Sequence, residues 1–307
     1  MEPRSLKYLA EAAVGELVQG DPQMRIARVC TDSRVVNPGD LFIALAGERF
    51  DGHSFVDEVA AKGVAAVVIE RGKAPAVLPP CGVILVAETR RSFVVIGARY
   101  RADFAVPVVA VAVSNGKTTT KDLLGTLLSQ RGPAVWSEAS FNNDIGVPQT
   151  LLRLEKKHWA LVQEIGTNHP GELPPLIAMA QPQLGIITSI GREHLEFFGD
   201  VAGVAQEEGW LAELLPGDGS LFLNGDSEWT DAIASRSRAA VVRAGLNENN
   251  DWRATNLQLD EQGVTFDVQA PRAPWCGSYR VNLLGRHQVT NSLLALAAGA
   301  ELGLTRE

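Results

Sequence analysis

Short apolar runs alternate with amphipathic segments along most of the chain, and this pattern predicts an α/β protein. Runs such as residues 106–113 are typical of strands buried on both faces of a parallel sheet. Strands are predicted at residues 26–31, 41–45, 64–70, 83–87, 106–113, 159–165, 184–190 and 220–224. Helices are predicted at residues 5–18, 54–62, 91–101, 118–130 and 288–302.

The pattern divides the chain into two domains, as expected for 307 residues. A loop rich in Gly, Pro and Ala at 71–82 precedes a strand, and we place the boundary near residue 87. From about residue 250 the pattern becomes β-like, with strands predicted at 255–259, 264–268 and 279–283. We predict a small N-terminal α/β domain (1–86), then a P-loop-type parallel-sheet ATPase domain (87–307) with an added β-rich segment.

Composition narrows the possible partners. The net charge of -8 argues against nucleic acid, because phosphate-backbone binding normally needs a basic face. No apolar run is long enough to span a bilayer, and the N-terminus lacks the apolar core of a signal peptide, so we expect a cytoplasmic protein without membrane insertion. The three cysteines are far apart and predict no zinc site or disulfide framework.

The strongest local signal lies at residues 108–121, where an apolar strand leads through a Gly-Lys-Thr turn into a helix. Free N–H groups and the positive end of the helix dipole would face a phosphate there. Lys117 would reach the β- and γ-phosphates of a nucleotide, and the Thr118 hydroxyl would bind Mg²⁺. The alternative is an ordinary strand–turn–helix with a surface lysine. The general P-loop pattern places Gly at the position of Val111.

Other segments, in the same order along the chain, resemble the Mur ligase family. The stretch Gly-Glu-Arg-Phe-Asp-Gly-His at 47–53 is similar to the substrate domain of its D-alanyl-D-alanine-adding members. The stretch Asn-Asn-Asp-Ile-Gly-Val-Pro at 142–148 is similar to a loop near the γ-phosphate. The remaining similar segments are 31–34, 37–45, 164–172, 191–196, 223–226 and 285–291. Together the resemblance covers nearly all of residues 25–304.

The resemblance implies an activity. Such a ligase uses ATP and Mg²⁺ to convert the terminal carboxylate of UDP-N-acetylmuramoyl-tripeptide into an acyl phosphate. The amine of D-alanyl-D-alanine then displaces phosphate, in peptidoglycan synthesis. We expect a monomer with these two small-molecule substrates. The family also has a third domain after a segment like 299–304, so we expect residues 1–307 to bind the UDP-linked substrate without completing ligation.

The resemblance also assigns site residues. The catalytic residues it implies are Lys117, Glu164, His194 and Glu208. The nucleotide-binding residues are Ser114, Asn115, Gly116, Lys117, Thr118, Thr119, Asn142, Asn143 and Asn291. The substrate-binding residues are Ser33, Arg34, Arg49 and His53. The metal ligands are Thr118, Glu164, His194 and Glu208.

Four positions depart from the family pattern. The phosphate loop has Ala112 and Val113 where the family has Thr and Gly, and a β-branched residue resists positive φ. Gln288 replaces the first Asn of the adenine-side motif. Glu208 stands where the family usually has a lysine that is carbamylated, a modification that turns an ammonium into a metal-binding carboxylate.

Several alternatives stay open at this point. His194 is also compatible with a hydrogen-bonded structural histidine, Glu208 with a solvated acidic helix face, and residues 32–34 with a self-contained turn. For the whole chain, the first alternative is a sister ligase that adds another amino acid. The second is a non-catalytic module that binds a UDP-muramoyl peptide or a nucleotide, which the altered phosphate loop favours.

Overall fold

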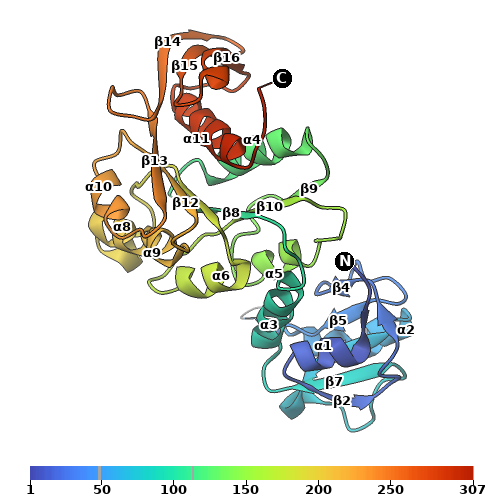
Figure 1. The fold of residues 1–307 in the computed structure, drawn as a ribbon. Helices are drawn as coiled ribbons and strands as arrows, with labels where there is room; N and C mark the ends of the chain where they lie inside the picture. Colours follow the sequence, from blue (N-terminus) through green and yellow to red (C-terminus); the bar gives the residue numbers. More distant parts are fainter. Residues whose placement is uncertain (48–49, 113, 307) are drawn as a thin grey trace. The chain divides into compact units, whose positions relative to one another are not determined.

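The computed structural model describes residues 1–47, 50–112 and 114–306. The chain forms two compact units (Figure 1). Unit 1 comprises Met1–Ala105 and Leu151–Lys156, and unit 2 comprises Val106–Thr150 and Lys157–Glu307. Within the described ranges, no helix has the length and apolar character needed to cross a membrane.

Unit 1 is built on a five-stranded sheet whose order is β2-β7-β6-β5-β4. Strand β2 pairs antiparallel with β7, and the other neighbours pair in parallel. The strands are β2 (Glu16–Gln19), β4 (Val29–Cys30), β5 (Leu41–Ile43), β6 (Ala66–Glu70) and β7 (Gly82–Val86), with a separate pair β1 (Arg4–Ser5) and β3 (Arg25–Ile26). The helices are α1 (Leu6–Ala12), α2 (Val56–Ala61) and α3 (Thr89–Arg101), with 3₁₀ turns η1 (Gly52–Phe55) and η2 (Arg71–Lys73).

The predicted helix at 5–18 is wrong in its second half. Helix α1 begins after Ser5, whose side chain caps the backbone N–H of Tyr8, and it ends at Ala12. Val14 then takes a positive φ of 52°, and the chain continues as strand β2. At Gly15 an added Cβ would lie 2.7 Å from the side chain of Ile84. Pairing with β7 therefore overrides the helical pattern of these residues.

Unit 2 is built on a nine-stranded sheet whose order is β16-β15-β14-β13-β12-β11-β8-β10-β9. Every pair from β9 to β14 is parallel, and β15 and β16 continue the sheet in antiparallel pairing. The strands are β8 (Val108–Ala112), β9 (Ala134–Trp136), β10 (Ala160–Glu164), β11 (Leu184–Ile187), β12 (Ser220–Asn224), β13 (Ala240–Gly245), β14 (Trp252–Asp260), β15 (Gly263–Gln269) and β16 (Gly277–Val281).

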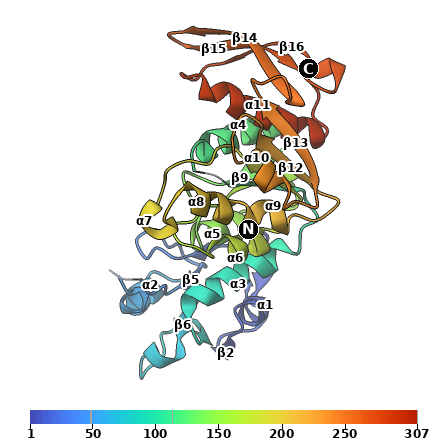
Figure 2. The ribbon, with the colours of Figure 1, turned by 90° about the vertical axis from the view of Figure 1, so that its left-hand side faces the viewer.

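Helices cover both faces of this sheet (Figures 1 and 2). Helices α4 (Lys117–Ser129) and α11 (His287–Glu301) pack together on one face, where leucines such as Leu124 and Leu293 join the valines of β8 in one buried cluster. Helices α6 (Leu173–Ala180), α8 (Val201–Glu208) and α9 (Trp210–Leu214) lie on the other side. The remaining elements are α5 (Gly146–Leu151), α7 (Leu195–Phe198), α10 (Thr230–Ala234) and η3 (Ala273–Trp275).

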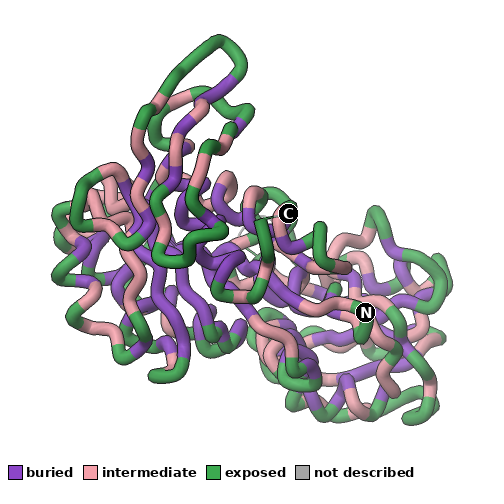
Figure 3. The backbone as a smooth tube through the Cα atoms, turned by 45° about the horizontal axis from the view of Figure 1, so that its top comes forward, coloured by how far each residue is buried: buried purple, intermediate pink, exposed green. Residues whose placement is uncertain are grey.

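The predicted fold class is confirmed: unit 2 has a parallel sheet with a β-rich addition, and that addition extends the same sheet. The strands at the centre of unit 2 are buried along their whole length (Figure 3), as their unbroken apolar runs predicted. The compact units divide after Ala105, whereas the sequence placed the domain boundary after Val86. Helix α3 packs against α1 and β6 and so belongs to unit 1.

Candidate nucleotide and metal site

The candidate site lies at the carboxyl edge of the unit 2 sheet. Strand β8 is flanked by β10 and β11, and all three run in parallel, so the loops that follow them meet at one edge. The loop after β8 leads into α4, whose first residue is Lys117. This arrangement places the free N–H groups of a helix start beside the ends of two neighbouring strands.

Hydrogen bonds join the loop after β8 to the loop after β11. The hydroxyl of Ser114 accepts from the backbone N–H of Gly191 at 2.9 Å. The carbonyl oxygen of Asn115 accepts from the hydroxyls of Thr188 and Ser189, the latter at 2.9 Å. These bonds fix the path of the loop through residues 114 and 115.

Gly116 is the residue that turns the chain into α4. Its φ of +92° lies in the left-handed region, which favours glycine, and an added Cβ would lie 2.8 Å from Oδ1 of Asn291. The amide of Asn291 is oriented by Gln288, whose Oε1 accepts from Asn291 Nδ2 at 3.0 Å. The structure therefore brings the predicted adenine-side residue Asn291 to the phosphate-loop glycine.

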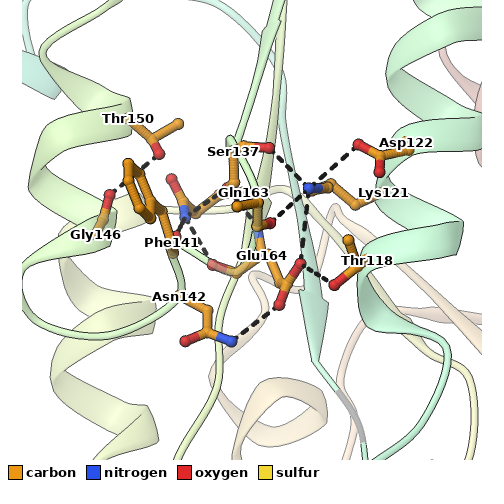
Figure 4. Close-up of polar contacts among 11 residues, drawn as sticks. Thr118, Lys121, Asp122, Ser137, Phe141, Asn142, Gly146, Thr150, Gln163 and Glu164 are labelled. Atoms are coloured by element: carbon orange, nitrogen blue, oxygen red, sulfur yellow. Dashed lines mark hydrogen bonds and ion pairs between the residues drawn. The ribbon is translucent and has the colours of Figure 1, made fainter.

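The carboxylate of Glu164 ends strand β10 and is fully enclosed, with 1% of its surface exposed. Its Oε2 accepts from the hydroxyl of Thr118 at 3.0 Å, and its Oε1 accepts from the amide of Asn142 at 2.9 Å (Figure 4). The ammonium of Lys121 lies 3.8 Å from Oε2. Three of the predicted site residues, Thr118, Asn142 and Glu164, are thus in direct contact.

Glu208 is the most unusual charged group of the site. Its side chain is 1% exposed, and neither carboxylate oxygen has a hydrogen-bond partner. Burial raises the pKa of Glu208 to about 8; Lys117 opposes this rise, and Glu193 and Glu207 add to it. The Nζ of Lys117 lies 3.7 Å from a carboxylate oxygen of Glu193.

The acidic pair at 207–208 is not a solvated helix face, which was one of the alternatives. Both side chains are buried. Glu207 accepts hydrogen bonds from the backbone N–H groups of Gly171 and Leu173, at the start of α6. Glu207 is therefore satisfied by a helix N-terminus, whereas Glu208 has no such partner.

The donor set of the site fits a hard cation such as Mg²⁺, which prefers oxygen ligands. It offers the Glu164 carboxylate beside the Thr118 hydroxyl, and the buried Glu208 carboxylate lacks a partner. Across the described part of the chain, no three His, Cys, Asp or Glu side chains are grouped closely enough to hold a metal by themselves. The assignment of the metal ligands therefore stays a prediction.

Other predicted residues have different surroundings. His194 precedes α7 with a φ of +50°. Asn143 accepts from the backbone N–H groups of Ile145 and Gly146, which fixes the start of α5. Thr119 lines a separate hollow of about 530 Å³ between α4, α11 and β16.

Unit 1 has its own hollow, of about 420 Å³, in the segment that the sequence linked to the UDP substrate. Its lining includes Ser33, Arg34 and the aromatic rings of Phe42, Phe50 and Phe55. Two of the predicted substrate residues therefore lie beside aromatic side chains, on which a planar base could stack.

The turn that carries Arg34 is held by an ion pair. Asp32 accepts from Arg34 through both carboxylate oxygens, at 2.9 and 2.6 Å. These bonds lower the pKa of Asp32 to about 2. Residues 32–34 thus form the contacts expected of a self-contained turn. Ser33 and Arg34 also line the hollow.

His53 does not line the hollow among the described residues. Its Nε2 accepts from the backbone N–H of Glu70 at 2.9 Å, so its Nδ1 carries the proton and donates to Asp51 at 2.6 Å. Both ring nitrogens thus serve the fold of unit 1, and a substrate contact by His53 stays only a prediction. The predicted residue Arg49 and the departure at Val113 lie outside the described residues.

Sequence reasoning missed two residues of the site. Lys121 lies one helical turn after Lys117 and reaches Glu164, and Glu193 reaches Lys117. The available signal for Lys121 was its spacing, because residues four apart lie on the same face of a helix. Nothing local distinguished Glu193 from a surface acid.

The fold and the site together define a class: an α/β protein with a P-loop-type domain, in which a buried parallel strand runs through a Gly-Lys-Thr turn into a helix beside a carboxylate. A family model described as the Mur ligase middle domain matches residues 111–299. A second, described as the catalytic domain of the Mur ligase family, matches residues 25–131. The chain belongs to the Mur ligase family.

Named relatives agree with this assignment. The UDP-N-acetylmuramoyl-tripeptide–D-alanyl-D-alanine ligase of Escherichia coli is 36% identical over 98% of this chain and 65% of its own length. The ligase of the same name from Bacillus subtilis is 32% identical over 100% of this chain and 66% of its own length. The chain thus spans about two thirds or slightly less of these curated relatives.

Solved structures show the same fold. A crystal structure of MurF from Acinetobacter baumannii matches with a TM-score of 0.91 and 32% identity, over 100% of this chain and 66% of that chain. MurF from Thermotoga maritima, in complex with ADP, matches with a TM-score of 0.80 and 25% identity, over 91% of this chain and 64% of that chain.

Proposed function

We propose that the chain contains the UDP-substrate and ATP-binding parts of a ligase that joins D-alanyl-D-alanine to UDP-N-acetylmuramoyl-tripeptide. The observation that carries the proposal is the contact of Thr118 with Glu164 at the phosphate-loop helix, in a chain whose relatives carry that name. In this proposal ATP is the phosphoryl donor, and the protein acts in the cytoplasm as a monomer.

The phosphate loop and its neighbours would align the γ-phosphate for transfer. Phosphoryl transfer needs charge neutralisation and alignment more than covalent help from the protein. Lys117 would exchange its contact with Glu193 for the β- and γ-phosphate oxygens. The backbone N–H groups at the start of α4 would bind the phosphates from the other side.

A divalent cation, when bound, would neutralise charge on the transferred phosphoryl group. Glu164 and Thr118 would hold it, with Glu208 and His194 as further predicted ligands. Asn142 orients the Glu164 carboxylate through its amide. The tripeptide carboxylate would then attack the γ-phosphorus and displace ADP. The amine of the dipeptide would attack the carbonyl carbon of the resulting acyl phosphate, lose a proton and displace inorganic phosphate, which leaves the new amide bond.

The hollow of unit 1 is the proposed site for the UDP end of the substrate. Aromatic rings line it beside Ser33 and Arg34, so it combines stacking surfaces with hydrogen-bond donors. The guanidinium of Arg34 is exposed and suits a phosphate oxygen, although that contact would compete with Asp32.

Binding measurements test the proposal and separate it from a sister ligase. Calorimetry should detect binding of ATP with Mg²⁺ and of UDP-N-acetylmuramoyl-tripeptide to residues 1–307. A solved neighbour is named for UDP-N-acetylmuramoyl-L-alanyl-D-glutamate, the dipeptide-linked nucleotide. Binding of that dipeptide form at least as tightly as the tripeptide form would favour the sister ligase.

The altered phosphate loop favours a second candidate function, a module that binds the UDP-linked peptide without using ATP. Ala112 and Val113 stand where the family has Thr and Gly. Binding of the UDP-linked tripeptide together with no detectable binding of ATP at millimolar concentration would establish this function instead.

A further inference from the structure

Lys121 is the only buried lysine or arginine among the residues of unit 2 that the structure describes. It lies on α4, one turn beyond Lys117, and only 1% of its side chain is exposed. A buried ammonium is costly unless its three N–H groups all find acceptors. The acceptors of Lys121 therefore indicate what the charge does.

Two of those acceptors are backbone carbonyls of one loop. The Nζ of Lys121 donates to the carbonyl oxygen of Ser137 at 2.8 Å (Figure 4). It also donates to the carbonyl oxygen of Ala139 at 2.8 Å. Ala139 has a φ of +43°, a conformation that costs energy for a residue other than glycine. Lys121 thus binds the strained turn of the loop that joins β9 to α5.

The remaining neighbours of the ammonium are carboxylates, which it contacts as ion pairs. Asp122 Oδ1 lies 3.2 Å from Nζ, and Glu164 Oε2 lies 3.8 Å away. The two carbonyl oxygens take two of the three N–H groups and the Asp122 carboxylate lies within reach of the third, so none is left for a phosphate. This separates Lys121 from Lys117, which begins the helix at the phosphate loop.

The loop held by Lys121 reaches the candidate site at its other end. The hydroxyl of Ser137 accepts from the backbone N–H of Glu164 at 2.9 Å. The side-chain amide of Asn142 donates to Glu164 Oε1, and the backbone carbonyl oxygen of Asn142 accepts from the backbone N–H of Gly166 at 2.9 Å. Lys121 therefore acts on the Glu164 carboxylate directly and through both ends of the loop.

We propose that Lys121 is a positioning residue of the nucleotide–metal site: its buried ammonium fixes residues 137–142 and the Glu164 carboxylate without touching the nucleotide. The inference rests on the proposed function, because Glu164 is there a ligand of the nucleotide-bound cation. Partners that orient a metal ligand commonly change metal affinity by roughly 10- to 100-fold when they are removed.

The test compares Lys121→Met, which keeps the chain length but has no donor, with Leu128→Ala. Leu128 lies on the same helix in the hydrophobic core, so its truncation loosens α4 without touching the loop. Calorimetry measures ADP binding to residues 1–307 with and without Mg²⁺. Hydrogen exchange reports the protection of residues 137–143.

In Lys121→Met, ADP should bind without Mg²⁺ within about three-fold of wild type, because the phosphate loop is intact. The tightening produced by Mg²⁺ should fall by roughly 10- to 100-fold. Exchange at residues 137–143 should become faster. Leu128→Ala should keep both the Mg²⁺ effect and the protection of the loop.

Two results would overturn the inference: an unchanged Mg²⁺ effect in Lys121→Met, or an equal loss in Leu128→Ala, which would mark a general loosening of α4. If Lys121→Met does not fold, Lys121→Gln replaces it, since glutamine keeps a polar head group and loses the charge. Wild-type protein without any Mg²⁺-dependent ADP binding would remove the proposed function, and this inference with it.

Discussion

At the residue scale, Glu208 combines two properties that rarely occur together. It is buried among other charged groups, and both of its oxygens lack a hydrogen bond. A carboxylate in that position is unfavourable unless it is protonated or bound to a cation. Both states can be tested, one through stability and the other through metal dependence.

The stability of the protein in the absence of divalent cations should fall between pH 4.5 and about pH 8 because of Glu208. The folded state keeps the proton over this range, while the unfolded chain releases it, so the stabilisation is complete below pH 4.5 and lost as pH rises through 8. Thermal melting in the presence of a chelator, repeated across this pH range, measures how the stability depends on pH.

Glu208→Gln is the matched control, because it keeps the size of the side chain and cannot ionise. Its melting temperature should depend less on pH than that of wild type, and it should be the more stable protein at pH 8 by a few kcal/mol at most. Parallel pH profiles for the two proteins would show that Glu208 does not titrate in this range.

The Mg²⁺ dependence of nucleotide binding tests whether the Glu208 carboxylate binds the metal. Wild-type Mg²⁺-dependent nucleotide binding should be equal in bicarbonate-free and bicarbonate-rich buffer, because Glu208 needs no carbamylation. Glu208→Gln should weaken the Mg²⁺ effect by roughly ten-fold or more. Glu208→Lys, which restores the residue typical of the family, should bind better when bicarbonate is present. Wild-type behaviour of Glu208→Gln would rule out a metal role.

At the scale of the element, strand β8 leads through a tight turn into helix α4, and the backbone conformation of that turn depends on a single glycine. Gly116 has a positive φ and lies against Asn291, while Lys117 begins the helix. The backbone of this turn and the charge of its lysine make separate contributions that two substitutions can distinguish.

Lys117→Ala should abolish the rise in melting temperature that ATP with Mg²⁺ produces in wild type. Ligand binding stabilises a protein by about 2.7 kcal/mol at one hundred times Kd, so the wild-type shift should be readily measurable. Lys7→Ala, at an exposed position in α1, is the control and should keep the shift. No shift in wild type at millimolar ATP would mean that the altered loop does not bind nucleotide.

Gly116→Ala should lower the stability of unit 2 by about 1–3 kcal/mol, because alanine is strained at positive φ and its Cβ meets Asn291. Denaturant unfolding measures the change. Gly72→Ala is the control: an added Cβ there has no neighbour within 4 Å, so its stability should match wild type. Equal effects of the two substitutions would contradict the close approach of Asn291 to the turn.

At the scale of the whole molecule, the two compact units should respond to different ligands. Hydrogen exchange should slow at residues 31–34 and at Gly52 and Phe55 with UDP-N-acetylmuramoyl-tripeptide, since these residues line the hollow of unit 1. It should slow at residues 114–118 with ATP and Mg²⁺. Protection of residues 114–118 but not of residues 31–34 by the UDP-linked peptide would contradict the assignment of its UDP end to unit 1.

The sequence alone predicted the family, the central strands β8, β10, β11 and β12, and helices α4 and α11, but not strands β9 and β13. The central strands are buried on both faces, so their apolar runs are unbroken and easily recognised. The Gly-Lys-Thr turn and the ordered motifs consist of residues that are neighbours in the sequence, so they can be recognised without the structure. The β-rich segment was likewise predicted from its change of periodicity.

Tertiary structure decided what local pattern could not. Residues 16–19 became a strand because β7 was there to pair with them. Glu207 was buried against the backbone N–H groups at the start of α6, and Glu208 was buried where the charges of Lys117 and Glu193 act on it. His53 was bonded at both ring nitrogens, by Asp51 and Glu70. Lys121 found its acceptors in a loop that follows another strand. Apart from Asp51, which is two residues from His53, the deciding partners are distant in sequence, so only the folded chain places them beside these residues.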